Sequence, residues 1–241
     1  MTQVCVIFGA GEYYAGTPVV PAGAYVIAAD GGLDHTRELG IVPDVVVGDF
    51  DSLEGRAPRT DVRTIALPAL KDDPDMLSAL KVGWSAGCRE VHVYGGLGGR
   101  IDHTISGIQL MALLARHGAS GYLYGDGLIV TAITDGRLSF PAHPVPEDGR
   151  MVSAFSHSDV SLGVNEPGLK YELKDSTLTN TVVQGVSNEF RDGVDAAISV
   201  KRGTLIVTFP IEVALPQVSR FHEFGGDIGE LDTEVSKLLV R

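Results

Sequence analysis

The runs AYVIAAD at residues 24–30 and DVVVGD at residues 44–49 decide the fold, because each is a short apolar stretch that stops at an aspartate. Runs of the same kind occur at residues 4–10, 62–68 and 91–96. Continuous apolar runs are typical of strands buried on both faces, as in a parallel sheet covered by helices. The five runs therefore predict a mostly parallel sheet.

Helical patterns lie between these runs. One helix is expected after Asp73, which fits an N-cap, with Pro74 at the first helical position. Another is expected over about 101–117, ended by Gly118. The alternation of strands and helices predicts an α/β fold with a doubly wound, mostly parallel sheet.

The pattern changes along the chain and predicts two domains. The α/β domain is expected over 1–140, and its last strands are predicted at 121–126 and 128–133. A proline-rich linker would lead to a small all-β sandwich at 150–210, which contains a hairpin that turns at Gly203. The tail, 211–241, carries Leu231, Val235, Leu238 and Leu239 at helical spacing and is predicted to form a docking helix.

The composition excludes several classes of partner. The 241 residues include 19 basic and 31 acidic side chains, which gives a net charge of −12. Nucleic-acid binding depends on clustered basic residues, and a bilayer-spanning helix needs about 20 apolar residues in succession. Neither pattern is present, and the first residues do not resemble a signal peptide. We therefore expect a cytoplasmic protein that binds neither nucleic acid nor membrane.

Aspartates gather where the predicted strands end and where helices begin. The set comprises Asp30, Asp49, Asp51, Asp72, Asp73, Asp75 and Asp102. In an open parallel sheet, ligands bind beyond the carboxyl ends of the strands. Carboxylates held close together would repel one another unless a hard cation such as Mg²⁺ neutralised them. The alternative for any single aspartate is an ordinary turn or N-cap.

A glycine-rich loop, GGLGGR at residues 95–100, lies between a predicted strand and a predicted helix. Backbone N–H groups in such a loop can bind phosphate, and Arg100 could add a bidentate contact. Gly9 and Gly11 form a weaker signal of the same kind. The alternative for both loops is a tight turn without a ligand.

Six motifs together resemble the thiamine pyrophosphokinase family, in its order and at about its spacings. They are ADGG at 29–32, PDVVVGDFDSL at 43–53, KDDPDM at 71–76, GGLGGRIDH at 95–103, GLKYEL at 168–173 and SNEF at 187–190. The resemblance implies an ATP-binding α/β domain followed by a thiamine-binding sandwich, assembled as a homodimer with active sites at the subunit interface. It also implies transfer of the pyrophosphoryl group of Mg·ATP to thiamine, which yields thiamine diphosphate and AMP.

The resemblance assigns roles residue by residue. Mg²⁺ would be held by Asp49, Asp51 and Asp75. Nucleotide phosphates would be bound near Asp30, Gly31, Gly32, Gly96, Gly98, Gly99 and Arg100. Catalysis would involve Asp51, Asp75, Arg100 and Asp102, and thiamine would meet Tyr171, Ser187 and Asn188. Either Asp102 or Asp75 could accept the hydroxyl proton.

The sequence departs from the family pattern at one position, and two alternative functions are compatible with part of it. Pro74 stands where the family often has threonine, so a hydroxyl contact there is absent. A pyrophosphokinase that acts on a pterin alcohol would share the ATP-binding half, although GLKYEL and SNEF argue against it. A non-catalytic nucleotide-binding protein is the second alternative.

Overall fold

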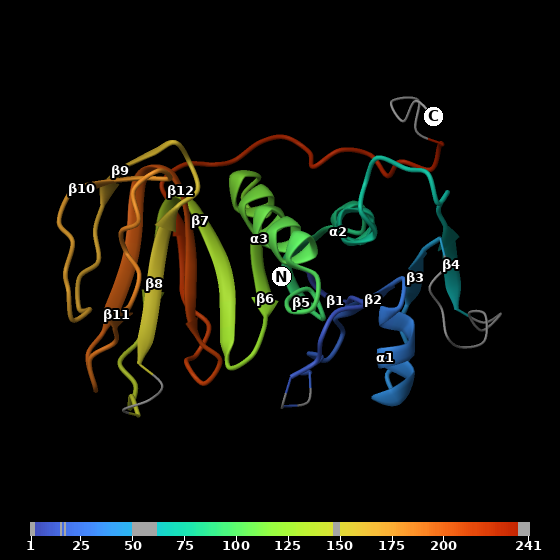
Figure 1. Ribbon diagram of the computed structural model, residues 1–241, viewed down its shortest axis with the longest axis horizontal. Helices are drawn as coiled ribbons and strands as arrows, with labels where there is room; N and C mark the ends of the chain where they lie inside the picture. Colours follow the sequence, from blue (N-terminus) through green and yellow to red (C-terminus); the bar gives the residue numbers. More distant parts are fainter. Residues whose placement is uncertain (1–2, 15, 17, 50–61, 147–149, 236–241) are drawn as a thin grey trace. The chain divides into compact units, whose positions relative to one another are not determined.

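The computed structural model describes residues 3–14, 16, 18–49, 62–146 and 150–235 (Figure 1). The chain divides into two compact units. The first unit comprises residues 1–107 together with the segment from 227 onward, and the second comprises residues 108–226.

The first unit contains a five-stranded parallel sheet. Its strands are β1 (Gln3–Phe8), β2 (Tyr25–Ala29), β3 (Val45–Gly48), β4 (Arg63–Ala66) and β5 (Cys88–Tyr94). They lie in the order β5-β1-β2-β3-β4, and every neighbouring pair is parallel. All five strands and the parallel sheet predicted from the apolar runs are therefore confirmed.

Helices α1 (Gly32–Glu38) and α2 (Asp75–Ser85) pack on opposite faces of this sheet, as Figure 1 shows. Gly83 of α2 lies over Ile27, whereas Leu33 of α1 packs with Ala28. Ile27 and Ala28 are successive residues of β2, and successive strand residues point to opposite faces. Helix α1 has no counterpart among the predicted helices.

The other two helix predictions need one correction. Helix α3 (Ile101–Arg116) is present, and Gly118 follows it with a φ of +76°. The N-cap of α2, however, is Pro74 and not Asp73. The carboxylate of Asp73 instead pairs with Lys81, a lysine that is only 8% exposed. A buried ammonium group needs this partner more than the exposed helix end needs a cap.

The second unit is built from antiparallel strands. They are β6 (Ser120–Tyr124), β7 (Leu128–Phe140), β8 (Met151–Ser156), β9 (Val160–Val164), β10 (Ser176–Thr179), β11 (Asn188–Glu189), β12 (Ala196–Pro210) and β13 (Gln217–Arg220). Strand β12 pairs with β7, β8 and β9, and β13 pairs with the other side of β7. The core between them includes Phe140, Phe190 and Phe209, whose rings meet edge to face.

Strands β7 and β12 explain why the units differ from the predicted domains. Their pairing runs from Leu128 opposite Pro210 to Phe140 opposite Ala196. This long register joins residues 128–140 to the antiparallel unit, whereas the sequence pattern assigned them to the α/β domain. The predicted hairpin at Gly203 is wrong, because β12 continues through that position with an irregular register between Val200 and Thr204.

The predicted docking helix is also absent from residues 211–235. Strand β13 pairs with β7 instead, with Val218 opposite Leu138. Glycines at 225, 226 and 229 lie between β13 and the predicted helical pattern, which begins at Leu231. Leu238 and Leu239 lie outside the described residues. Within the described parts of the chain, no helix has the length and apolar character needed to cross a bilayer.

Candidate active site

Three aspartates lie together in the first unit, at the carboxyl ends of its strands. Asp30 follows β2, Asp49 follows β3, and Asp75 begins α2. The ammonium group of Lys71 lies between two of them, 3.0 Å from Asp75 Oδ1 and 3.5 Å from Asp49 Oδ2. The Lys71 side chain is only 6% exposed. The sequence-predicted crevice is thus a carboxylate cluster that already contains one internal cation.

The electrostatics of this cluster reflect its burial. Burial raises the pKa of Asp75, and the nearby carboxylates of Asp30 and Asp49 raise it further, whereas Lys71 opposes the shift. Burial disfavours the charge on Lys71, but hydrogen bonds and attraction to Asp75 and Asp49 leave its pKa raised overall. Lys71 is therefore held as a cation by the charges that it neutralises.

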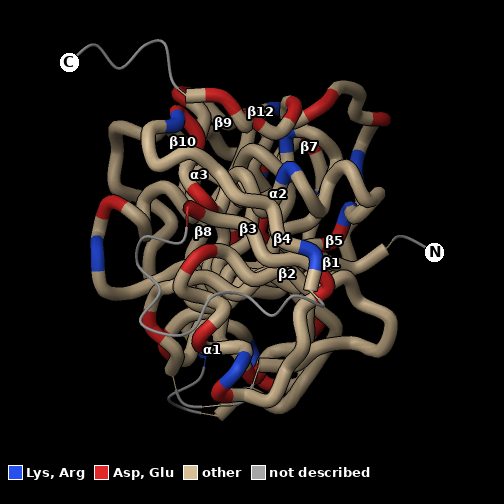
Figure 2. The backbone as a smooth tube through the Cα atoms, turned by 90° about the vertical axis from the view of Figure 1, so that its right-hand side faces the viewer, with Lys and Arg blue, Asp and Glu red and all other residues tan. Residues whose placement is uncertain are grey.

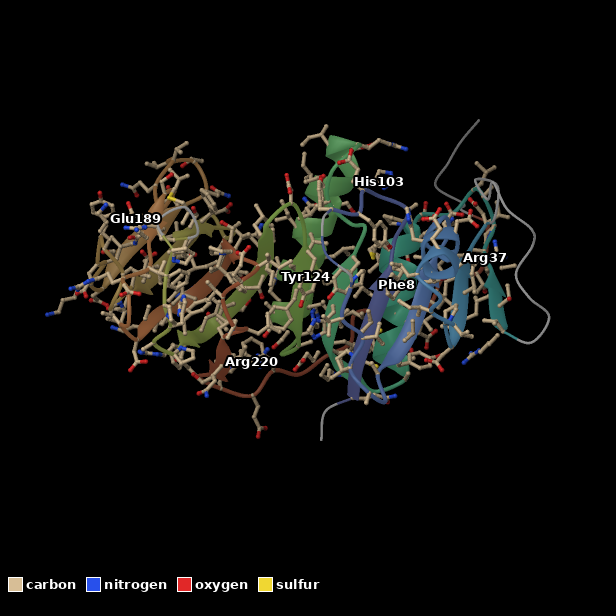
Figure 3. The ribbon with its side chains drawn as sticks, turned by 90° about the horizontal axis from the view of Figure 1, so that it is seen from below. Phe8, Arg37, His103, Tyr124, Glu189 and Arg220 are labelled. Atoms are coloured by element: carbon tan, nitrogen blue, oxygen red, sulfur yellow. The ribbon has the colours of Figure 1, made fainter. Side chains whose placement is uncertain are left out.

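The backbone around Asp30 is tightly constrained. Asp30 has a φ of +47°, an unusual value for a residue with a side chain, and its N–H donates to Val47 O at 2.8 Å. A Cβ on Gly48 would lie 3.0 Å from Asp30 Cα, and one on Gly32 would lie 1.9 Å from Phe8 O. Figure 3 labels Phe8, which belongs to β1. The glycines thus let β2, β3 and the start of α1 approach one another closely.

The glycine-rich loop packs against the loop that follows β1. The N–H of Gly11 donates to Gly95 O at 2.8 Å, and a Cβ on Gly11 would lie 2.5 Å from the same oxygen. Gly95, Gly98 and Gly99 have φ values of +67°, +81° and +62°. Close packing therefore accounts for several of these glycines, and the predicted phosphate contacts of Gly96, Gly98 and Gly99 remain a prediction.

Arg100 and Asp102 lie at the start of α3, and they pair with each other. Arg100 Nε donates to Asp102 Oδ1 at 3.2 Å, and Asp102 Oδ1 also accepts the His103 N–H at 3.0 Å. Both charged side chains are exposed, and Figure 3 shows the neighbouring His103 at the end of the helix. This pairing raises the pKa of Arg100 and lowers that of Asp102. The guanidinium therefore keeps its charge at neutral pH, and its contact with a phosphate remains a prediction.

The first unit offers ligands that fit a hard divalent cation. Asp49 and Asp75 direct carboxylate oxygens at one cationic atom, Lys71 Nζ, and oxygen is the ligand that Mg²⁺ prefers. Asp51, the third predicted ligand, lies outside the described residues. Within the described residues, no group of three or more histidine, cysteine or acidic side chains is placed to hold a metal. The donor chemistry fits, and Lys71 already occupies part of the position.

The second unit contains a cavity of about 560 Å³ that includes all three predicted thiamine residues, Tyr171, Ser187 and Asn188. Tyr171 is 59% exposed, and the ammonium group of Lys170 lies 5.3 Å from the centroid of its ring. Ser187 has a φ of +59°, and its N–H donates to Ser153 Oγ at 3.1 Å. The structure therefore brings these three residues to one site.

The Asn188 side chain is fully engaged within the protein. Its Nδ2 donates to Glu166 Oε2 and to Tyr171 O, both at 2.8 Å. Its Oδ1 accepts the N–H groups of Tyr171 at 3.0 Å and Glu189 at 2.9 Å. Figure 3 shows Glu189 in this unit. Asn188 is thus a buried link that fixes the Tyr171 backbone, and its amide has no spare donor for a ligand.

Comparison with known proteins gives a family assignment for part of the chain. Residues 19–123 match the family model described as Thiamin pyrophosphokinase, catalytic domain. This segment of the chain is therefore similar to the catalytic domain of thiamin pyrophosphokinases. The resemblance predicted from the six motifs is therefore confirmed, as is the prediction of an enzyme of the thiamine diphosphokinase class, a transferase. No curated protein matches the chain significantly in sequence.

Several solved thiamin pyrophosphokinases share the fold. The protein from Bacillus subtilis has a TM-score of 0.75 at 21% identity, over 88% of this chain and all of that one. The Candida albicans enzyme has a TM-score of 0.68 at 12% identity, over 88% of this chain and 90% of that one. The yeast enzyme has a TM-score of 0.65 at 13% identity, over 87% and 86%. At these identities the likeness establishes a shared mixed-sheet fold with few helices.

The family model covers the predicted site residues of the first unit but not those of the second. The matched segment contains Asp30, Asp49, Asp75, Arg100 and Asp102, whereas the cavity of the second unit lies beyond it. Two buried charged residues have no sequence-based assignment. Lys71 had a signal, since it stands four residues before Asp75 among other acids. Glu166 had none, because nothing in VNEPG distinguishes it from a turn residue.

Proposed function

We propose that this protein transfers the pyrophosphoryl group of Mg·ATP to the hydroxyethyl oxygen of thiamine, which yields thiamine diphosphate and AMP. The observation that carries the proposal is the match to a thiamin pyrophosphokinase catalytic domain over the segment that contains the acidic cluster. We further propose that the first unit is the ATP-binding α/β domain and the second the thiamine-binding β-sandwich.

The residues of the first unit would bind and orient the triphosphate. Asp49, Asp51 and Asp75 would hold Mg²⁺, which when bound neutralises phosphate charge. Asp30 and the glycines at 31, 32, 96, 98 and 99 would lie along the nucleotide. Arg100 would leave Asp102 and stabilise negative charge on the phosphates. This exchange would leave the Asp102 carboxylate unpaired beside the reacting groups.

The remaining step is attack by the thiamine hydroxyl on the β-phosphorus, with AMP as the leaving group. The hydroxyl proton passes to a carboxylate, either Asp75 or Asp102. Correct placement of the two substrates supplies much of the acceleration in phosphoryl transfer. Tyr171 would stack on the cationic substrate, and an exposed aromatic ring suits that contact. Ser187 would contact thiamine directly, whereas Asn188 would act by fixing Tyr171.

We also propose a cytoplasmic homodimer with active sites at the subunit interface, as the family resemblance implies. The decisive assay incubates the full chain with ATP, Mg²⁺ and thiamine and identifies both products by mass. Formation of AMP and thiamine diphosphate is expected. Formation of ADP would mean an ordinary kinase, and transfer to a hydroxymethylpterin but not to thiamine would mean the pterin enzyme. Either result would overturn the proposal.

A further inference from the structure

Glu166 is a buried carboxyl group in the wall of the second-unit cavity. The residue is 2% exposed and lines the cavity together with Tyr171, Ser187 and Asn188. Its Oε2 accepts a hydrogen bond from Asn188 Nδ2 at 2.8 Å. Its Oε1 is buried and, within the described part of the chain, has no hydrogen-bond partner.

An orphaned carboxylate oxygen is costly, so its presence in a cavity wall calls for a donor. Burial raises the pKa of Glu166, and the hydrogen bond from Asn188 only partly offsets that shift. Leaving one buried charged acceptor unpaired costs about 1–3 kcal/mol or more. None of the ion pairs among the described residues involves Glu166, so no described side chain compensates its charge.

The proposed substrate supplies the missing chemistry. Thiamine has a positive charge and an exocyclic amino group on its pyrimidine ring, and that group is a hydrogen-bond donor. Resting on the function proposed above, we infer that Glu166 Oε1 accepts a hydrogen bond from this amino group. Glu166 is then the residue that selects a pyrimidine with an N–H donor at that position. Tyr171 and Ser187 would contact the thiamine rings. They lack the carboxylate acceptor that would distinguish an amino group from an oxo group.

The hydrogen bonds of Asn188 allow a specific test, because they determine how a glutamine at position 166 would be oriented. In a Glu166→Gln variant, Asn188 Nδ2 still needs an acceptor, since its other hydrogen bond goes to Tyr171 O. The glutamine oxygen must therefore face Asn188, and its NH₂ group would take the position of Oε1. A donor would then stand where the wild-type protein has an acceptor.

The test measures affinity and kcat/KM of the full chain for thiamine and for the analogue with an oxo group in place of the amino group. Wild-type protein is expected to prefer thiamine by about 10-fold or more, because a site built for one donor rejects the compound that lacks it. Glu166→Gln should abolish or reverse this preference. Glu172→Gln is the matched control. Glu172 is an exposed glutamate in the same loop that accepts the Gly168 N–H, and the preference should persist there.

The outcomes separate this inference from the proposed function. If wild-type protein forms thiamine diphosphate but Glu166→Gln keeps the wild-type preference, the selectivity role is wrong and the function stands. If Glu166→Gln does not fold, the wild-type ratio decides alone, and equal binding of the two compounds overturns the inference. If wild-type protein binds neither compound and makes no AMP, both the function and the inference fail.

Discussion

The two units treat their buried carboxylates in opposite ways. In the first unit, Asp49 and Asp75 share the ammonium group of Lys71. In the second unit, Glu166 has only the neutral amide of Asn188. Figure 2 marks acidic positions in red and basic positions in blue, and the acids outnumber the bases along the chain by 31 to 19. The two buried lysines that pair with carboxylates, Lys71 and Lys81, both belong to the first unit.

This difference in charge compensation indicates which kind of ligand each site could bind. A carboxylate cluster with its own cation is stable without a ligand, and an incoming metal must compete with that cation. A carboxyl group with an orphaned oxygen gains a partner only when a donor enters its cavity. The first site is thus compensated within the protein, whereas the second would be completed by a ligand that donates a hydrogen bond.

The largest expected effect comes from removing a charge of the first cluster. Asp75→Asn should lower kcat by about 10²–10⁴-fold, because a proposed metal ligand and candidate proton acceptor is lost. Steady-state assays of AMP release at saturating Mg²⁺ measure it. Asp126→Asn, at an exposed turn, is the control and should retain full activity. Near wild-type turnover in Asp75→Asn would remove the cluster from the mechanism.

The second test concerns the internal cation. Lys71→Gln should tighten binding of Mn²⁺, measured in the absence of nucleotide, by about 10-fold or more. The reason is that loss of one positive charge 3–4 Å from the carboxylates is worth a few kcal/mol near a protein surface. Titration followed by electron paramagnetic resonance gives the affinity. Lys201→Gln makes the same change in net charge at an exposed pair with Asp175 and should have no effect. Unchanged or weaker Mn²⁺ binding in Lys71→Gln would contradict the idea of competition.

A third test breaks the link that holds Glu166. Asn188→Ala should lower the free energy of unfolding by about 2–4 kcal/mol, because the change strands the Glu166 carboxyl and the Tyr171 backbone groups. Urea denaturation measures the loss. Asn180→Ala is the matched control, since that exposed amide donates to the exposed Asp159 side chain. A loss no larger than that of the control would show that the network adds little to stability.

The smallest effect is a dependence of stability on pH. Burial raises the folded-state pKa of Glu166 above its usual value of 4.5, so the folded state binds the proton more tightly than the unfolded state does. Stability from this group is present below pH 4.5 and is lost as the pH rises from 4.5 through the raised pKa. Glu166→Gln removes this loss, so the stability of the variant relative to wild type should rise across that window. Parallel pH curves from urea unfolding would show that Glu166 titrates normally.

The sequence was most informative where local chemistry settles the structure. Five β-branched runs predicted the parallel sheet, and the motifs predicted the family. The helical spacing of Leu231 and Val235 was misleading, because the described chain has no helix at these residues. The turn signal at Gly203 was also misleading, since β12 keeps pairing with β7 on both sides of it.

The amino-acid sequence by itself determined which side chains end the parallel strands, because apolar runs and the aspartates that stop them are local patterns. Only the tertiary structure decided how those charges are compensated. Lys71 reaches Asp49 across 22 positions of the chain, and Asn188 reaches Glu166 across the same separation. The motifs that contain Lys71, Asp49 and Asn188 do not show which residues they contact. Each contact depends on how distant segments pack and on the energetic cost of leaving a buried polar group without a partner.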